Sequence, residues 1–140
     1  MKRKSRPDSI SGLNVQWPWS RKLLTGEKTV ETRGYPLPEK HIGQPLAIIE
    51  TPGKRGKREA DIKEASVIGI VTFSGCFKYE TAAQWKSDFR RHMVDETDVI
   101  LKFRANKEKW GWIVKSIEPL SPPRPAPKKR GIVFANNCKV

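Results

Sequence analysis

The stretch WPWSRKLLTGEKTVETRGY, residues 17–35, decides the fold because it predicts a helix, a stop and a strand in direct succession. Proline suits the first turn of a helix and glycine its C-terminal end, so a short helix is expected from near Pro18 to a stop at Gly26. The β-branched alternation in residues 28–33 then predicts a strand. Its two faces are expected to carry Thr29, Glu31 and Arg33 on one side and Lys28, Val30 and Thr32 on the other.

Further strands are expected along the rest of the chain, because short apolar or alternating runs recur between turn residues. These runs are residues 12–16, 45–50, 66–77, 110–120 and a last strand within 131–140. The proline-rich segment 121–130 is expected to be an extended connection.

One amphipathic helix is expected in TAAQWKSDFRRHM, which starts at Thr81. Thr81 and Gln84 have the spacing of a capping box, and Trp85, Phe89 and Met93 follow four residues apart. The charged segment 51–66 is expected to be an exposed loop, and residues 98–104 fit either a short helix or a strand.

The order of these elements shows no regular alternation of strand and helix, which favours an α+β fold over a doubly wound sheet. Short strands with inserted helices predict a small, partly open β-barrel. The length of 140 residues fits one domain. We expect residues 1–11 to form a flexible basic segment and residues 12–140 to form the domain.

The net charge of +13 lies in the two terminal thirds of the chain. Residues 1–40 hold nine Lys/Arg against four Asp/Glu, residues 41–100 nine against nine, and residues 101–140 ten against two. Such an uneven balance indicates a polyanionic partner, most commonly nucleic acid. A membrane surface is the rival partner, but no basic helix with a clean apolar face supports it.

The cysteines and histidines show no spacing typical of metal ligands, and the sequence shows no cluster of three carboxylates that could bind Mg²⁺. We therefore expect neither a metal nor another cofactor. Cys76 and Cys138 are expected to be free thiols in a reducing cytoplasm, because no apolar signal segment follows the basic start. The basic clusters 2–6 and 127–130 resemble nuclear-import signals, so a nuclear location is the alternative if the organism is eukaryotic.

The opening stretch resembles the signature of the ASCH domain, a member of the PUA-like β-barrel superfamily. The family pattern is a Pro-Trp or Pro-Tyr step, a short helix, and then Gly-x-Lys-x-x-Glu-x-Arg. In this chain it falls without a gap on Pro18, Trp19, Gly26, Lys28, Glu31 and Arg33. In outline the resemblance extends over residues 12–135, and it implies a PUA-like barrel with inserted helices.

The resemblance also implies that RNA or nucleotides bind in a cleft beside the Gly-x-Lys-x-x-Glu-x-Arg strand. Some family members are thought to be nucleic-acid-binding coactivator modules, and at least one is described as a metal-independent ribonuclease. Some small bacterial members are amidohydrolases that act on N4-acetylcytidine, with a lysine at the position of Lys28 and a threonine nucleophile at the position of Glu31. Glu31 has no hydroxyl group, and this departure argues against amidohydrolase activity here.

The candidate catalytic residues are Lys28, Glu31 and Tyr35, which offer an acid, a base and a cation for attack of an RNA 2′-hydroxyl on the adjacent phosphate. The ordinary alternatives are a solvated Lys28 and a salt bridge between Glu31 and Arg33 that is worth roughly 0–1 kcal/mol. The candidate nucleic-acid contacts are Trp17, Trp19, Ser20, Arg33, Lys107 and Trp112. A tryptophan would stack on a base or fill the core, and Ser20 would alternatively cap the helix.

Three hypotheses follow from these residues. The first is a protein that binds RNA, preferably single-stranded, and cleaves it without a metal. The second is a module that binds RNA or DNA without catalysis. The third is an amidohydrolase that acts on a modified nucleoside such as N4-acetylcytidine.

Overall fold

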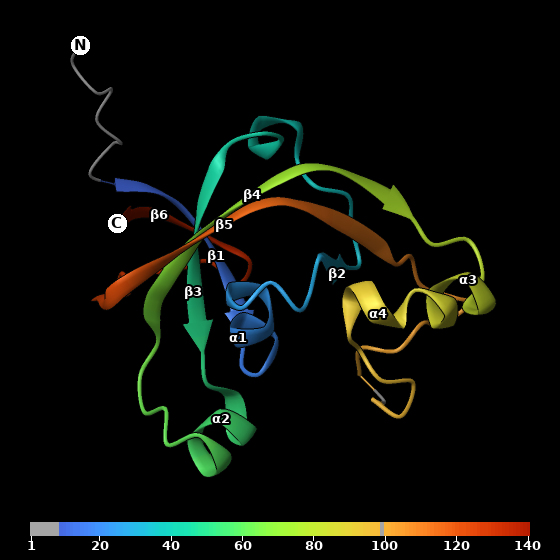
Figure 1. Cartoon of the computed structure of the whole chain (residues 1–140), viewed down its shortest axis with the longest axis horizontal. Coiled ribbons are helices and arrows are strands. Elements are labelled where there is room, and N and C mark those ends of the chain that lie inside the picture. The colour runs from blue at the N-terminus through green and yellow to red at the C-terminus, as the bar shows by residue number, and fades with distance from the viewer. Residues whose placement is uncertain (1–8, 99) are drawn as a thin grey trace.

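One mixed sheet of six strands organises the computed structural model, which describes residues 9–98 and 100–140 (Figure 1). The strands, in chain order, are β1 (Ser9–Gln16), β2 (Val30–Arg33), β3 (Pro45–Thr51), β4 (Ser66–Lys78), β5 (Trp110–Pro125) and β6 (Phe134–Lys139). Their order across the sheet is β2-β5-β4-β3-β1-β6, and only the β1–β3 pair of this ladder is parallel. The helices are α1 (Trp19–Leu24), the 3₁₀-helix η1 (Glu39–His41), α2 (Gly53–Glu59), α3 (Ala82–Ser87) and α4 (Phe89–His92).

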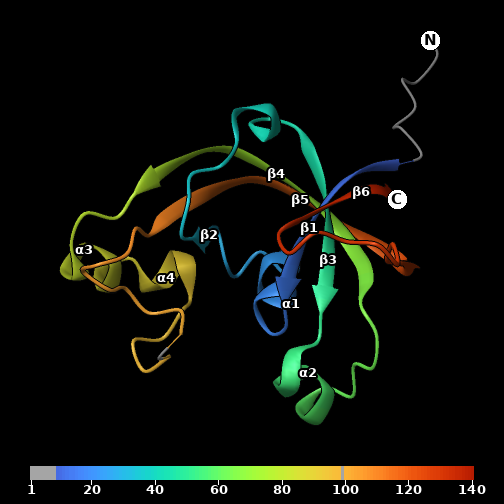
Figure 2. The same cartoon turned by 180° about the vertical axis from the view of Figure 1, so that it is seen from behind.

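The mixed sheet and the separate helices confirm the predicted α+β fold. The long strands β4 and β5 arch over the short strand β2 (Figures 1 and 2). The described part of the sheet has two edges, β2 and β6, and its ladder is not closed into the expected barrel.

The first strand begins earlier than expected. β1 starts at Ser9 rather than at Gly12, and its pairing with β6 begins at Ser9 opposite Lys139. Residues 9–11 therefore belong to the sheet and not to a flexible segment. The rest of that segment, residues 1–8, lies outside the described residues.

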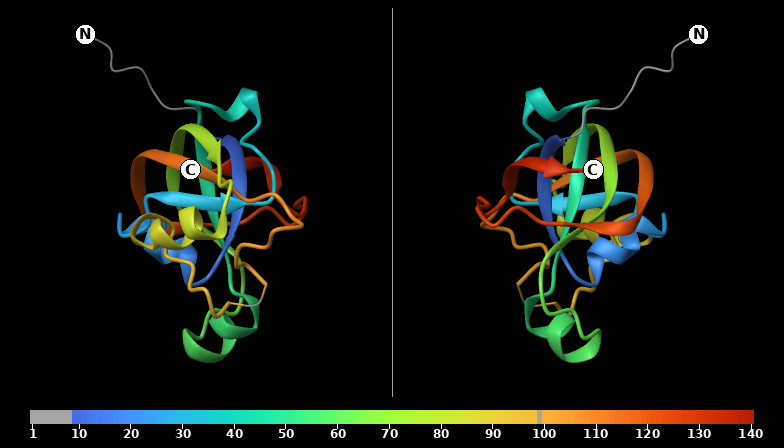
Figure 3. Two further views of the ribbon diagram at one scale, coloured as in Figure 1. Left: turned by 90° about the vertical axis from the view of Figure 1, so that its right-hand side faces the viewer. Right: turned by 90° about the vertical axis from the view of Figure 1, so that its left-hand side faces the viewer.

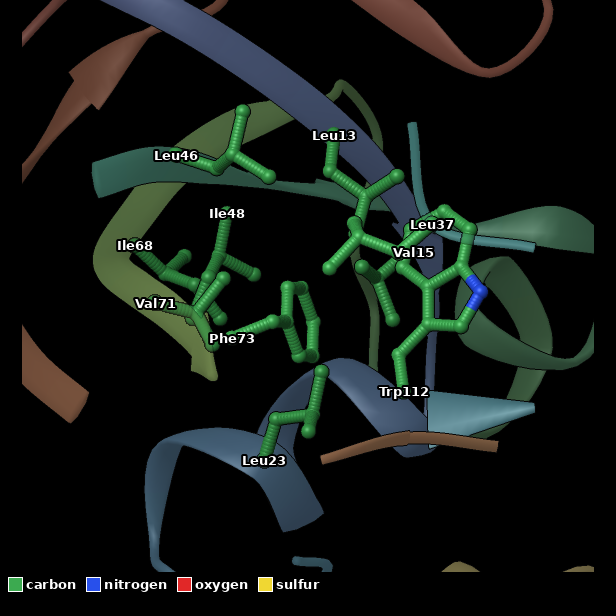
Figure 4. Close-up of a cluster of buried hydrophobic side chains, with 10 residues drawn as sticks. All are labelled: Leu13, Val15, Leu23, Leu37, Leu46, Ile48, Ile68, Val71, Phe73 and Trp112. Carbon is green, nitrogen blue, oxygen red and sulfur yellow. The ribbon is translucent and has the colours of Figure 1, made fainter. Parts of the chain in front are cut away.

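The main hydrophobic core fills the concave side of the sheet (Figure 4). Its buried members are Leu13, Val15, Leu23, Leu37, Leu46, Ile48, Ile68, Val71, Phe73 and Trp112. A second cluster takes the other face of β3 through Ala47 and Ile49. β3 is thus buried on both faces, as its continuous apolar run predicts, and each fully buried Leu or Ile contributes about 1.5–3 kcal/mol.

The charged segment expected to be a loop contains helix α2. Two interactions hold this glycine-containing helix in place. Gly56 is buried, and its backbone lies so close to Trp17 that an added Cβ would be 3.3 Å from the Trp17 Cβ. Arg55 and Glu59 form an ion pair of 2.9 Å one helical turn apart.

The amphipathic helix expected from Thr81 is two short helices, α3 and α4, which break at Asp88. Asp88 accepts hydrogen bonds from Tyr79 and Arg91, and these bonds hold its carboxylate at the junction. Thr81 caps α3 as expected, although the Gln84 side chain accepts from the Glu80 amide rather than from Thr81. The described part of 98–104 forms turns, and β5 continues through the proline-rich segment to Pro125.

Candidate nucleic-acid interface

Lys28, Glu31 and Arg33 form a triad directly after helix α1, in which Lys28 and Glu31 are buried and Arg33 is half-buried. Gly26 has a φ of +84°, which turns the chain out of the helix, and the Lys28 amide then donates to the Lys22 carbonyl. Lys28 therefore precedes β2 and does not follow its alternation. Its Nζ lies 3.5 Å from Glu31 Oε1, so the expectation that these two side chains occupy opposite faces is wrong.

The Lys28 ammonium has no exposed surface. Besides the ion pair with Glu31, its Nζ donates a hydrogen bond to the backbone oxygen of His92, at the end of α4. Burial lowers the pKa of Lys28 below its ordinary value, and the neighbouring Glu31 carboxylate offsets only part of this effect. Lys28 is thus an internal group that links β2 to the helical insert, and the solvated-lysine alternative is wrong.

Arg33 provides the second cation of the triad and connects two strands. Its Nη2 donates to Glu31 Oε2 at 2.9 Å and to the backbone oxygen of Asn14, on β1, at 2.7 Å. Its guanidinium also lies 5.7 Å from the centroid of the Trp112 ring. Burial alone would raise the pKa of Glu31, but the charges of Arg33 and Lys28 outweigh it and hold that pKa below its ordinary value.

Tyr35 and Trp112 support Arg33 from behind. Burial would lower the pKa of the Arg33 guanidinium, but the Glu31 carboxylate and the neighbouring Tyr35 hydroxyl raise it. The Trp112 Nε1 donates to the Tyr35 backbone oxygen at 3.1 Å, and the two rings meet edge to face at 5.8 Å. Trp112 has no exposed surface, so it packs in the core and presents no free ring face for a base.

A cleft of about 440 Å³ opens where β1 and β2 face each other without pairing. Its wall carries Trp19, Glu31, Arg33 and, from a segment about a hundred residues away, Lys128 and Arg130. The charged side chains of the cleft are therefore three cations and one carboxylate, and Trp19 is its aromatic ring.

Asn14 joins the walls of this cleft. Its backbone oxygen accepts from Arg33, and its side-chain Nδ2 donates to the carbonyls of Gly131 at 2.8 Å and Ile132 at 3.2 Å. Its amide also donates to the Val133 carbonyl at 2.9 Å. These bonds fix residues 131–133, and with them the adjacent basic run 128–130, beside β1.

The remaining predicted residues do not line the cleft. Ser20 is buried and donates to Glu50 Oε2 at 2.8 Å, whereas Pro18 occupies the N-cap of α1 expected for Ser20. Trp17 packs beside α2, with the Arg55 guanidinium 5.5 Å from its ring centroid. Lys107 is exposed in a turn before β5.

The structure thus brings together Trp19, Glu31 and Arg33 from the predicted set, with Lys28, Tyr35 and Trp112 behind them. Sequence reasoning missed Asn14, Lys128 and Arg130. The basic run at 128–130 was visible as charge, but nothing in its local sequence shows that it lies against β1.

Within the described ranges, no group of three or more His, Cys, Asp or Glu side chains could hold a metal ion. In the same part of the chain, no helix is long and apolar enough to cross a membrane. Cys76 and Cys138 are free, as predicted.

Solved structures of ASCH proteins share this fold. A serine-to-alanine mutant of ZmASCH from Zymomonas mobilis superposes with a TM-score of 0.66 at 17% identity, covering 94% of this chain and 90% of that chain. Another structure of ASCH from Zymomonas mobilis superposes with a TM-score of 0.62 at 18% identity, covering 85% of this chain and 75% of that chain. A tyrosine-to-phenylalanine mutant of ZmASCH also has a TM-score of 0.62 at 18% identity, covering 82% of this chain and 74% of that chain.

No protein-family model matches the chain, and no curated protein matches it in sequence. The similarity therefore lies in three-dimensional structure. It is extensive enough to define the class: this chain has the ASCH-domain fold.

Proposed function

We propose that the chain binds single-stranded RNA in the cleft between β1 and β2. The observation that carries this proposal is the combination of the half-buried Trp19 ring with the cations of Arg33, Lys128 and Arg130 around one cleft. A base stacked on an aromatic ring gains about 1–3 kcal/mol, and Lys or Arg side chains bind the phosphates. The cleft volume of about 440 Å³ falls in the range of small-ligand sites and suits one nucleotide of a strand.

Binding is tested with a labelled single-stranded RNA and the variant Lys128→Ala/Arg130→Ala. Removal of two phosphate contacts should reduce the slope of log K against log salt by about 1.4 and weaken binding on the order of tenfold at low salt. The matched control is Lys40→Ala/Lys139→Ala, which removes the same charge from exposed positions outside the cleft. Equal affinity of the cleft variant and wild type would contradict the proposal, and a parallel DNA titration shows whether the 2′-hydroxyl matters.

A second candidate function, metal-independent cleavage of the bound RNA, is favoured by the position of Glu31. Its carboxylate lines the cleft between two cations, and both cations favour its ionised form. As a general base it would take the proton of a 2′-hydroxyl, whose oxygen then attacks the adjacent phosphorus. The P–O5′ bond breaks, a 2′,3′-cyclic phosphate forms, and the leaving 5′-oxygen takes a proton from water. Arg33 would stabilise the charge that develops on the phosphate.

This candidate centres on Glu31, because the Lys28 ammonium is buried behind Glu31 and acts on its carboxylate. Glu31→Gln should abolish cleavage of a labelled RNA by highly purified protein, and EDTA should leave the wild-type rate unchanged. Cleavage at the wild-type rate by Glu31→Gln would point to a contaminating nuclease and leave binding as the function. Acetate release from N4-acetylcytidine would instead support the amidohydrolase.

A further inference from the structure

A second basic surface lies outside the cleft, around helix α2. It consists of Trp17, Lys54, Arg55, Lys57 and Arg58, and we name it the α2 surface. We infer that the α2 surface is a second RNA contact, which binds the phosphates of the strand where it leaves the cleft. This inference rests on the proposed function, since it extends the path of the same strand.

The cations of α2 are arranged for a charged partner. Lys57 and Arg58 lie three and four residues after Lys54, so all three side chains lie on one side of the helix. All three are exposed. In the part of the chain that the structure describes, no carboxylate pairs with Lys54 or Lys57, while Glu59 pairs with Arg55 at 2.9 Å and Arg58 at 3.7 Å.

This helix is fixed to the body of the domain. Gly56 packs on Trp17, the Arg55 guanidinium covers the Trp17 ring, and the Trp17 amide donates to the Thr51 carbonyl at 2.8 Å. A freely solvated charged loop would have to be ordered on binding, at a cost in conformational entropy. The cations of α2 are already held in place, so less of the binding free energy is lost.

The α2 surface is continuous with the cleft. Gln16 and Thr51 both line the cleft, and α2 begins two residues after Thr51. The side chain of Gln16 lies so close to Gly53 that a Cβ at that position would overlap it. A strand that leaves the cleft beside Gln16 therefore meets the first turn of α2. The path suits a flexible single strand, whose phosphates repeat along the backbone.

The test compares two labelled single-stranded RNAs. One has about three nucleotides, which place one nucleotide in the cleft and extend little beyond it, and the other has about fifteen and reaches α2. The variant is Lys54→Gln/Lys57→Gln, and its matched control is Lys40→Gln/Lys139→Gln. The control residues lie far from α2: Lys139 pairs with the opposite end of β1, and η1, which holds Lys40, lies at the other end of the molecule (Figure 3). Thermal unfolding followed by circular dichroism shows that each variant is folded.

We expect the α2 variant to bind the long RNA on the order of tenfold more weakly at low salt, with a salt slope about 1.4 smaller than that of wild type. Its affinity for the short RNA and the control variant's affinity for both RNAs should stay at the wild-type level. Unchanged binding of the long RNA, or an equal loss in the control, would overturn the inference and leave the cleft proposal standing. Failure of wild-type protein to bind either RNA would overturn both.

Discussion

The Arg33 guanidinium donates a hydrogen bond of 2.7 Å to the backbone oxygen of Asn14, and this bond joins the two strands that flank the cleft. β1 and β2 are not neighbours in the sheet, so a side chain makes the connection that the β-ladder does not. The same guanidinium neutralises Glu31 at 2.9 Å. Arg33 therefore holds the cleft in shape and also supplies part of its charge.

Arg33→Ala should lower the free energy of unfolding by about 3–5 kcal/mol, because it leaves the buried Glu31 carboxylate with one cation fewer. Arg33→Lys should cost less, since it keeps the charge but loses the fork that reaches both Glu31 and Asn14. Urea unfolding measures both values. A loss below about 1 kcal/mol for the alanine variant would show that the triad contributes little to stability.

Lys28 should make stability depend on pH in the alkaline range. Burial, which outweighs the pull of Glu31, lowers its pKa in the folded protein below the ordinary value of 10.5. Between these two pKa values the unfolded chain binds the proton and the folded chain does not, so rising pH favours folding. Relative to Lys28→Met, which cannot titrate, wild type should gain up to about 1.4 kcal/mol per pH unit as the pH rises towards 10.5. Urea unfolding of the pair at several pH values measures the gain, and a constant difference would contradict it.

His92 should make the helical insert sensitive to acid. Its Nδ1 accepts from the Val94 amide at 2.9 Å, so Nε2 carries the proton and donates to the Trp85 carbonyl at 2.7 Å. Burial lowers the pKa of His92 below its ordinary value of 6.5, and the contact with Trp85 offsets only part of this. As the pH decreases below 6.5, the unfolded chain takes up the proton before the folded chain does. The free energy of unfolding should therefore decrease by up to about 1.4 kcal/mol for each unit by which the pH is lowered.

The protection factors of the amides in residues 82–94, which correct for the slower intrinsic exchange at low pH, should therefore fall on acidification in wild type. His41→Gln is the control for the other histidine and should keep this response, whereas His92→Gln should lose it. If His92→Gln shows the same acid response as wild type, the response comes from carboxylates and not from His92.

Ser20 should prove to be a stability residue and not a nucleic-acid contact. Its hydroxyl is buried and donates to Glu50 Oε2, which also accepts from Arg21 at 2.7 Å. Ser20→Ala should lower the free energy of unfolding by about 1–3 kcal/mol, because the hydrogen bond to a charged group is lost. Its dissociation constant for RNA should equal that of wild type. A weaker affinity of this variant for RNA, with an unchanged free energy of unfolding, would show that Ser20 contacts the nucleic acid.

Sequence patterns located most strands and the end of α1 because local physics determines them. The glycine at position 26 adopts the left-handed conformation that its place after a helix predicts, and the apolar run of β3 is buried on both faces. The same local signals failed for α2, where two glycines and many charges indicate a loop. Packing of Gly56 on Trp17 stabilises the helix there, and that contact joins residues far apart in the sequence.

The site was predictable in its residue types but not in its arrangement. The family spacing identified Lys28, Glu31 and Arg33. A lysine next to charged residues, however, is predicted to be exposed. Its burial depends on a carbonyl of α4, more than sixty residues away. The place of Lys128 and Arg130 could not be predicted either, because their segment is held beside β1 by hydrogen bonds between Asn14 and residues 131–132.

The parallel pairing of β1 with β3 has a consequence for the order of folding. Parallel strands require a long crossover, and residues 17–44, which contain the whole triad, are that crossover. β1 and β3 can pair only after this segment has closed as a loop between them, so their pairing and the assembly of the triad depend on the same loop closure. Substitutions in residues 17–44 should therefore change the folding rate as well as the charged site.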